Sequence, residues 1–269
     1  MNTQRSVALP MYLSNRAALL ALWPGLRAHL VRAGIADVPE ALEWPQDYPA
    51  HWHNPQLLLS QSCGYPLSHA LAGVAQLVGV FTYDAPGCEG ILCRSQLVAR
   101  QEHAHCTLAD FRGLRVAFNS DDSQSGYNAL RAAIAPLAHG GRFFASAAAT
   151  GGHAASLAAV QQGRADLAAI DCVTFAGLGR DMPQAVAGLC TIGQTQPYPG
   201  LPLVTGSHTS ASEVLALQSA LAAVVRDPAA AEALAVLGIT GFETLPLARY
   251  QICVDMRLQA AALGYPILA

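Results

Sequence analysis

Residues 115–130 have the types and spacing that a small-anion site requires. Arg115–Phe118 is a short apolar run typical of a buried strand, a polar turn follows, and from about Ser125 the apolar spacing becomes helical. The first N–H groups of a helix have no intrahelical partner, and the helix dipole adds positive charge there. Phosphate or carboxylate oxygens are therefore favoured at this position. The same pattern also fits a helix cap without a ligand, because Ser and Asp are common capping residues.

Four consecutive residues would form this site. We expect Ser123, Gln124 and Ser125 to add side-chain donors, and Gly126 to let a ligand approach the backbone closely.

A second strand-to-helix turn carries Gln61 and Cys63, which we expect to bind ligand. A thiol at a helix start has a lowered pKa, so Cys63 is also a candidate nucleophile. Catalysis would need a base within hydrogen-bond reach, and the candidates are His69 on the same helix and the distant His153. We expect ligand binding at Cys63 and no catalytic residue.

Composition excludes several kinds of chemistry. The 269 residues contain no lysine, which removes the Schiff-base nucleophile, the pyridoxal-phosphate anchor and the phosphate-loop lysine. A net charge of −3 argues against a nucleic-acid partner, which usually meets a basic face. No apolar run is long enough to predict a membrane-spanning helix.

The cysteines and histidines do not predict a metal site or a disulfide framework. Seven cysteines are scattered without a Cys-x-x-Cys pair, which fits a reducing compartment. The pairs His51/His53 and His103/His105 have usable spacings but no complete ligand set. We expect no metal and no cofactor.

Alternating strands and helices predict an α/β fold with parallel strand pairing. Two successive runs of such elements predict two lobes, residues 1–98 plus 203–269 and residues 99–202, with hinge segments near 95–100 and 196–204.

Six stretches then occur in a characteristic order, at residues 58–67, 87–90, 108–119, 123–127, 151–157 and 163–171. Together they resemble the phosphate/phosphite/phosphonate-binding proteins of ABC importers, a branch of the type 2 periplasmic-binding fold. The resemblance spans nearly the whole chain. It implies two lobes, each a mixed sheet flanked by helices, with a two-segment hinge and a ligand in the interlobe cleft.

The resemblance also implies site residues. The Ser-Thr-Ser-Gly phosphonate loop of the family matches residues 123–126, with Gln124 in place of Thr, and its ligand histidine matches His153. Further expected ligand residues are Tyr12, Tyr65, Tyr83 and Asp171, although Asp171 also fits a helix cap. The family's aminophosphonate binders use acids near the second hinge. Residues 196–202 contain none, which argues against such a ligand.

The expected function is that of an ABC-importer solute-binding protein that closes on a phosphonate, phosphate or similar oxyanion. The alternative is a cytoplasmic enzyme or ligand sensor on the same fold; no clear acid/base pair supports the enzyme. We expect a monomer whose partner is a transporter permease. The start of the sequence shows no signal peptide, so we expect a periplasmic location only with an upstream signal, and a cytoplasmic one as written.

Overall fold

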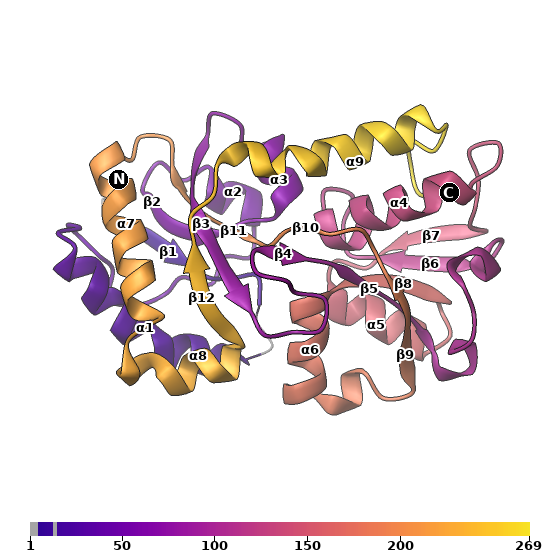
Figure 1. Ribbon diagram of the computed structural model, residues 1–269, viewed down its shortest axis with the longest axis horizontal. Coiled ribbons are helices and arrows are strands. Elements are labelled where there is room, and N and C mark those ends of the chain that lie inside the picture. Colours follow the sequence, from indigo (N-terminus) through magenta and orange to yellow (C-terminus); the bar gives the residue numbers. More distant parts are fainter. Residues whose placement is uncertain (1–4, 13–14) are drawn as a thin grey trace. The chain divides into compact units, whose positions relative to one another are not determined.

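The computed structural model describes residues 5–12 and 15–269. The chain forms two compact units, each built from segments that are distant in sequence (Figure 1). The first unit contains residues 1–84 and 199–249, and the second contains residues 85–198 and 250–269. Among the described residues, no helix combines the length and the apolar character needed to cross a bilayer.

The first unit contains a mixed sheet with the strand order β1-β2-β11-β3-β12. β1 and β2 are parallel, whereas β11 and β12 are antiparallel to their neighbours. The strands are β1 (Ser6–Ala8), β2 (Leu57–Gln61), β3 (Ala75–Tyr83), β11 (Pro202–Gly206) and β12 (Ile239–Glu243). Because β11 is antiparallel to both β2 and β3, the strands β1, β2 and β3 all end at the same edge.

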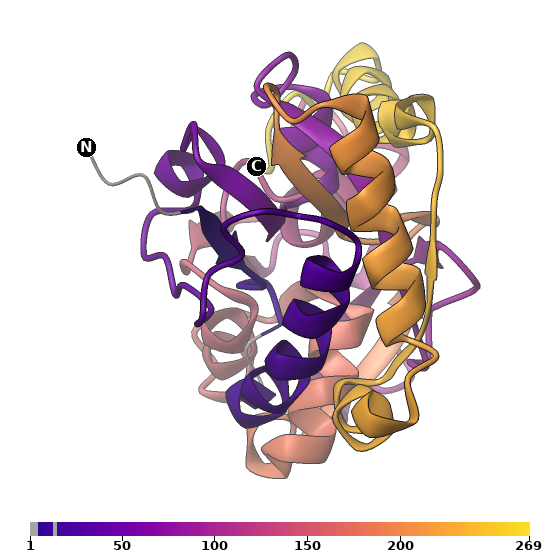
Figure 2. The same cartoon turned by 90° about the vertical axis from the view of Figure 1, so that its left-hand side faces the viewer.

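Helices of the first unit include α1, which packs against α7 and α8. Figure 2 shows α1 and α7 side by side. The apolar face of α1 buries Leu19, Leu22, Leu26 and Leu30, at the spacing that a helix needs to bury one side. The helices of this unit are α1 (Arg16–Arg32), α2 (Tyr48–Trp52), α3 (Gly64–Ser68), α7 (Ala211–Val224) and α8 (Ala231–Leu237).

The second unit contains a mixed sheet with the strand order β7-β6-β8-β5-β9. β6 is parallel to β7 and β8, and β5 is antiparallel to β8 and β9. The strands are β5 (Ser95–Arg100), β6 (Arg115–Phe118), β7 (Ser146–Ala149), β8 (Leu167–Asp171) and β9 (Leu189–Gln194); the short strands β4 (Leu92–Cys93) and β10 (Tyr198–Pro199) pair separately.

Alternating strand residues fill two hydrophobic cores in the second unit. Leu97, Val116 and Leu167 face the core that contains Leu130 of α4, while Val98 and Ala168 face the core beside α5. This alternation is the period-two pattern of a sheet covered on both faces. The helices are α4 (Ala129–Ile134), α5 (His153–Gln161), α6 (Cys172–Asp181) and α9 (Gln251–Ala262).

The α/β architecture with a mixed sheet in each of two units is confirmed. The alternation of strands and helices alone favours purely parallel strand pairing. The observed strand pairing is mixed. All pairings of β5, β9, β11 and β12 in these two sheets are antiparallel.

The unit boundaries differ from the expected lobes in two places. The chain first crosses from one unit to the other between residues 84 and 85, and not near 95–100. The reason is that β5 pairs with β8 and β9 of the second sheet. Residues 250–269 belong to the second unit and not to the first, because the backbone oxygen of Ala269 accepts hydrogen bonds from Phe143 and Phe144. The chain crosses back between residues 198 and 199, which lies inside the expected hinge segment 196–204.

Candidate functional site

The sheet of the second unit gathers polar residues at one edge. The loop that starts at Asn119 follows β6, and His153 follows β7. Because β6 and β7 are parallel, both segments lie at the carboxyl end of the sheet, which is where α/β folds place ligand sites. Ser95 lies at the same edge, since it begins the antiparallel strand β5 opposite Asp171.

Residues 123–126, the anion loop, begin a continuous helical segment. A turn of π-helix, η4 (Gln124–Asn128), leads directly into α4. Ser123 caps it, since its Oγ accepts a hydrogen bond of 3.0 Å from the N–H of Gly126. The backbone N–H of Asn128 donates to the backbone carbonyl of Ser123 at 2.9 Å, and this bond closes the wide π-helical turn. Single π-helical turns of this kind occur frequently at functional sites.

His153 is the first residue of α5 and meets the anion loop. Its Nε2 atom lies 2.9 Å from Oγ of Ser125, and one of the two groups donates. Burial lowers the pKa of His153 to about 4, with a smaller opposing effect from the backbone of Ala169. The ring is therefore neutral near pH 7 and has one N–H to donate.

Gly126 is needed for space and not for an unusual backbone angle. A Cβ atom at this position would overlap Oδ1 of Asn119 and lie 3.2 Å from Cε1 of His153. Asn119, which follows β6, and His153, the first residue of α5, thus pack against the Cα atom of Gly126. Sequence reasoning missed Asn119 as part of this arrangement.

Gln124 directs its side chain into the unit. Its Oε1 accepts a hydrogen bond of 2.8 Å from Asn128, and its Nε2 lies 3.2 Å from Sδ of Met256 on α9. The residue is 1% exposed. The side-chain amide of Gln124 is therefore engaged inside the unit, and a ligand contact by Gln124 stays a prediction.

A hydrogen-bond chain behind the loop was also missed. Ser95 Oγ donates to the backbone oxygen of Ser125 at 2.8 Å and lies 2.7 Å from the hydroxyl of Tyr198. Since the Ser95 proton is used, Tyr198 donates to Ser95. Burial raises the pKa of Tyr198 well above its usual value, which keeps this hydroxyl protonated. Neither residue belongs to a motif, and the sequence places both only within the expected hinge segments 95–100 and 196–204.

Asp171 ends β8 and caps α6. Its carboxylate accepts a hydrogen bond of 2.9 Å from the N–H of Thr174, and the residue is 3% exposed. The capping role considered in the sequence is therefore present. A ligand contact by Asp171 stays a prediction.

Polar residues also gather at the corresponding edge of the first unit. Gln61 at the end of β2 donates to the hydroxyl of Tyr83 at the end of β3, at 3.4 Å. The rings of Tyr12 and Tyr83 meet edge to face, with centroids 5.1 Å apart. The structure thus brings together three of the residues that were predicted separately.

Cys63 and Tyr65 lie at the start of α3, immediately after this cluster. Cys63 is the N-cap residue of the helix, and both side chains are buried. The ring of Tyr65 stacks on that of His69 with centroids 5.5 Å apart. The histidine proposed as a base for Cys63 is therefore engaged with a neighbouring tyrosine.

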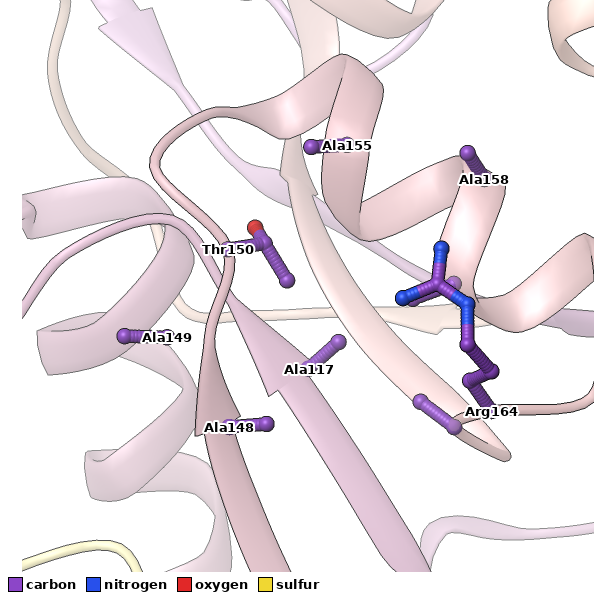
Figure 3. A pocket seen from close by; sticks show the side chains of 9 residues that line it. Ala117, Ala148, Ala149, Thr150, Ala155, Ala158 and Arg164 are labelled. Carbon is purple, nitrogen blue, oxygen red and sulfur yellow. The ribbon is translucent and has the colours of Figure 1, made fainter.

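A groove of about 420 Å³ lies elsewhere on the second unit, beside α5 (Figure 3). Thr150 and Arg164 are its polar residues. The rest of the lining is alanine, at positions 117, 148, 149, 155, 158, 159 and 165. Because the anion-loop residues do not line it, the groove is separate from the candidate site.

Comparison with known proteins identifies a family that this chain matches. A family model described as "ABC transporter, phosphonate, periplasmic substrate-binding protein" matches residues 56–250. No curated protein matches the chain.

Solved structures share the fold. PhnD1 from Prochlorococcus marinus, in complex with methylphosphonate, has a TM-score of 0.75 at 15% identity, covering 96% of this chain and 98% of that one. XAC2383 from Xanthomonas citri, bound to ATP, has a TM-score of 0.71 at 16% identity, covering 97% and 98%. A binding protein component of an ABC phosphonate transporter from Pseudomonas aeruginosa has a TM-score of 0.71 at 16% identity, covering 97% and 88%.

The identities to these structures are low, so they establish the fold and not the ligand. The family model, in contrast, covers well over half of the chain and includes both the anion loop and His153. The chain belongs to the family of periplasmic substrate-binding proteins of ABC phosphonate transporters.

Proposed function

We propose that this protein is the solute-binding component of an ABC importer and binds a small phosphorus oxyanion, a phosphonate or phosphate. The observation that carries the proposal is the contact of 2.9 Å between Ser125 and His153 at the start of a helical segment. A neutral imidazole, two serine hydroxyls and first-turn N–H groups are uncharged donors suited to an anion. They also suit a chain with a net charge of −3, which does not attract anions through its overall field.

In this proposal the anion loop and His153 contact the oxyanion. Ser125 sits on a backbone held by Ser95, so its hydroxyl has a fixed position relative to the helix start. Preorganised donors lose little freedom on binding, which favours affinity. The cluster of Tyr12, Gln61 and Tyr83, with the adjacent Cys63 and Tyr65, is the proposed contact set of the first unit.

The family supports two further inferences. We infer that the macromolecular partner is the permease of an ABC transporter, and that the protein works in the periplasm, where members of this family act. XAC2383 shows that one fold relative has been obtained with ATP, so a larger phosphate ester belongs in the ligand screen.

The test is a thermal-shift screen against phosphate, phosphite, methylphosphonate, 2-aminoethylphosphonate, ATP, sulfate and simple carboxylates. A ligand at a hundredfold excess over its dissociation constant adds about 2.7 kcal/mol of stability. For a chain of this size that corresponds to a rise in Tm of roughly 5–10 °C. We expect such a rise with phosphorus oxyanions and not with carboxylates.

The specific variant is Ser125→Asp, which places a negative charge at the proposed anion position and should abolish the shift. Ser212→Asp is the matched control, because Ser212 is exposed in the first turn of α7, where a negative charge is tolerated. Retained binding by Ser125→Asp would contradict the site. No shift with any phosphorus oxyanion would contradict the function and favour the sensor or enzyme alternative.

A further inference from the structure

Three thiols from separate segments meet in the second unit. Cys88 lies in the loop before β4, Cys93 ends β4, and Cys172 is the first residue of α6. Sγ of Cys88 lies 3.5 Å from Sγ of Cys172 and 3.7 Å from Sγ of Cys93, and the three sulfur atoms all lie within 4.8 Å of one another. All three cysteines are free.

The spacing of these sulfur atoms is close to that of a metal site. Thiolates bind zinc at about 2.3 Å, which places neighbouring sulfur atoms about 3.8 Å apart in a tetrahedral site and about 4.0 Å apart in a trigonal one. Shifts of a few tenths of an ångström would bring the two distances from Cys88 to these values, and the distance between Cys93 and Cys172, which is below 4.8 Å, would have to shorten by at most about 1 Å. A disulfide would instead require one pair to approach to about 2.0 Å.

The chain around the cluster holds it in place. Gly87 has a positive φ of 109°, and a Cβ there would lie 3.0 Å from Cβ of Cys172 and 3.1 Å from Nε2 of Gln96. The loop can therefore approach α6 closely only with glycine at this position. Gln96 also donates to the carbonyl of Pro86, which fixes the backbone two residues before Cys88.

The electrostatic setting favours a bound cation. The carboxylate of Asp171 adds negative charge beside the cluster and repels thiolates at Cys88 and Cys93. A metal ion would relieve this repulsion. Cys93 and Cys172 are buried, whereas Cys88 is partly exposed and gives an ion access.

We propose that Cys88, Cys93 and Cys172 bind one thiophilic d¹⁰ metal ion, Zn²⁺ or Cu⁺. Thiolate ligands select these ions over the hard cations Mg²⁺ and Ca²⁺. The two candidates differ in what they require. Cu⁺ is satisfied by three sulfur ligands, whereas Zn²⁺ takes a fourth ligand, which water can supply. This site is distinct from the anion loop and does not depend on the identity of the transported ligand.

The experiment measures metal binding by the reduced, metal-free full-length protein without oxygen. Zn²⁺ is titrated in competition with a chromophoric zinc chelator, and Cu⁺ in competition with bicinchoninate. We expect one tightly bound equivalent per chain, with release of thiol protons. Binding of Co²⁺ then reports coordination, because thiolate ligands produce an intense charge-transfer band.

Cys88→Ser is the decisive variant, because Cys88 lies in a partly exposed loop and its replacement does not disturb the buried core. It should lose the bound equivalent and the cobalt charge-transfer band. Cys190→Ser is the matched control: its thiol lies on β9 and donates to the carbonyls of Ala99 and Arg100, away from the cluster. We expect the control to retain full binding.

Two results would overturn the proposal. One is that the reduced wild-type protein binds neither ion, which would leave the thiols as apolar packing groups. The other is equal binding by the wild-type protein and Cys88→Ser. Both readouts are independent of anion binding, so failure here is distinguishable from failure of the proposed transport function.

Discussion

Nε2 of His153 lies 2.9 Å from Oγ of Ser125, although 28 positions separate the two residues in sequence. The contact forms because each residue follows one of two adjacent parallel strands, β6 and β7. It joins the start of one helix to the start of another. Two sets of first-turn N–H groups therefore point toward the same region of the second unit.

Replacing His153 with alanine should weaken binding of the phosphorus oxyanion with the largest thermal shift. A hydrogen bond to a charged group contributes about 1.5–3 kcal/mol, so we expect Kd to rise roughly 10- to 100-fold. Isothermal titration calorimetry measures the change directly. His139→Ala, at an exposed position of the same unit, is the control and should keep the wild-type Kd. An unchanged Kd in His153→Ala would remove this residue from the site.

His153 should also make stability depend on pH. Its pKa is about 4 in the folded protein, below the ordinary histidine value of 6.5 that applies to the unfolded chain. Between these values the unfolded chain binds more protons, so the free energy of unfolding falls as the pH drops from about 6.5 to about 4. Urea denaturation across this range should show a flatter profile for His153→Gln. Parallel profiles for the two proteins would contradict the lowered pKa of His153.

Gly126→Ala should destabilise the fold, although alanine normally favours a helix. The new Cβ would overlap Oδ1 of Asn119, and overpacking of this kind typically costs about 1–3 kcal/mol. Urea denaturation measures this loss. Removing the overlapping group in the double variant Gly126→Ala/Asn119→Ala should recover most of it.

Gly179→Ala is the matched control, because among the described residues the nearest atom to its new Cβ outside the helix backbone is Cγ2 of Val186 at 3.8 Å. It lies inside α6, so alanine should leave stability unchanged or raise it by up to about 1 kcal/mol. Equal effects of the two substitutions would show that Gly126 is not required for space.

Local signals explain what could be predicted from the sequence. The strand at residues 115–118 and the turn after it were predicted from hydrophobic spacing and capping residues, which act over a few positions. His153 was predicted by the family resemblance and by its position at a helix start. Its contact with Ser125 follows from strand pairing, which local spacing does not reveal.

The missed features depend on contacts between distant segments. Cys172 is separated from Cys88 by 84 positions, so no spacing motif signals that their thiols meet. The C-terminal residues were expected in the first lobe, because the sequence does not show on which sheet an apolar helix face such as that of α9 packs. The unit of α9 is decided by specific contacts, such as the hydrogen bond from Asn128 to the carbonyl of Cys253.

The cluster of the first unit is tested by Tyr83→Phe, which removes one hydroxyl and keeps the ring stacked edge to face with Tyr12. The hydroxyl accepts a hydrogen bond of 3.4 Å from Gln61, so we expect the free energy of unfolding to fall by only about 0.5–1.5 kcal/mol. If the cluster contacts ligand, Kd for the phosphorus oxyanion should rise about tenfold or more, since a hydrogen bond to a charged group contributes about 1.5–3 kcal/mol and 1.4 kcal/mol is a factor of ten.

Tyr48→Phe controls for the loss of a tyrosine hydroxyl in the same unit. The hydroxyl of Tyr48 donates to the carbonyl of Pro10 at 3.4 Å, a bond of the same length as that between Gln61 and Tyr83. Both variants should therefore lose similar stability, while only Tyr83→Phe loses affinity in calorimetric titration. Equal Kd values for the two variants would mean that the tyrosine cluster is structural, and that the residues of the second unit bind the anion without it.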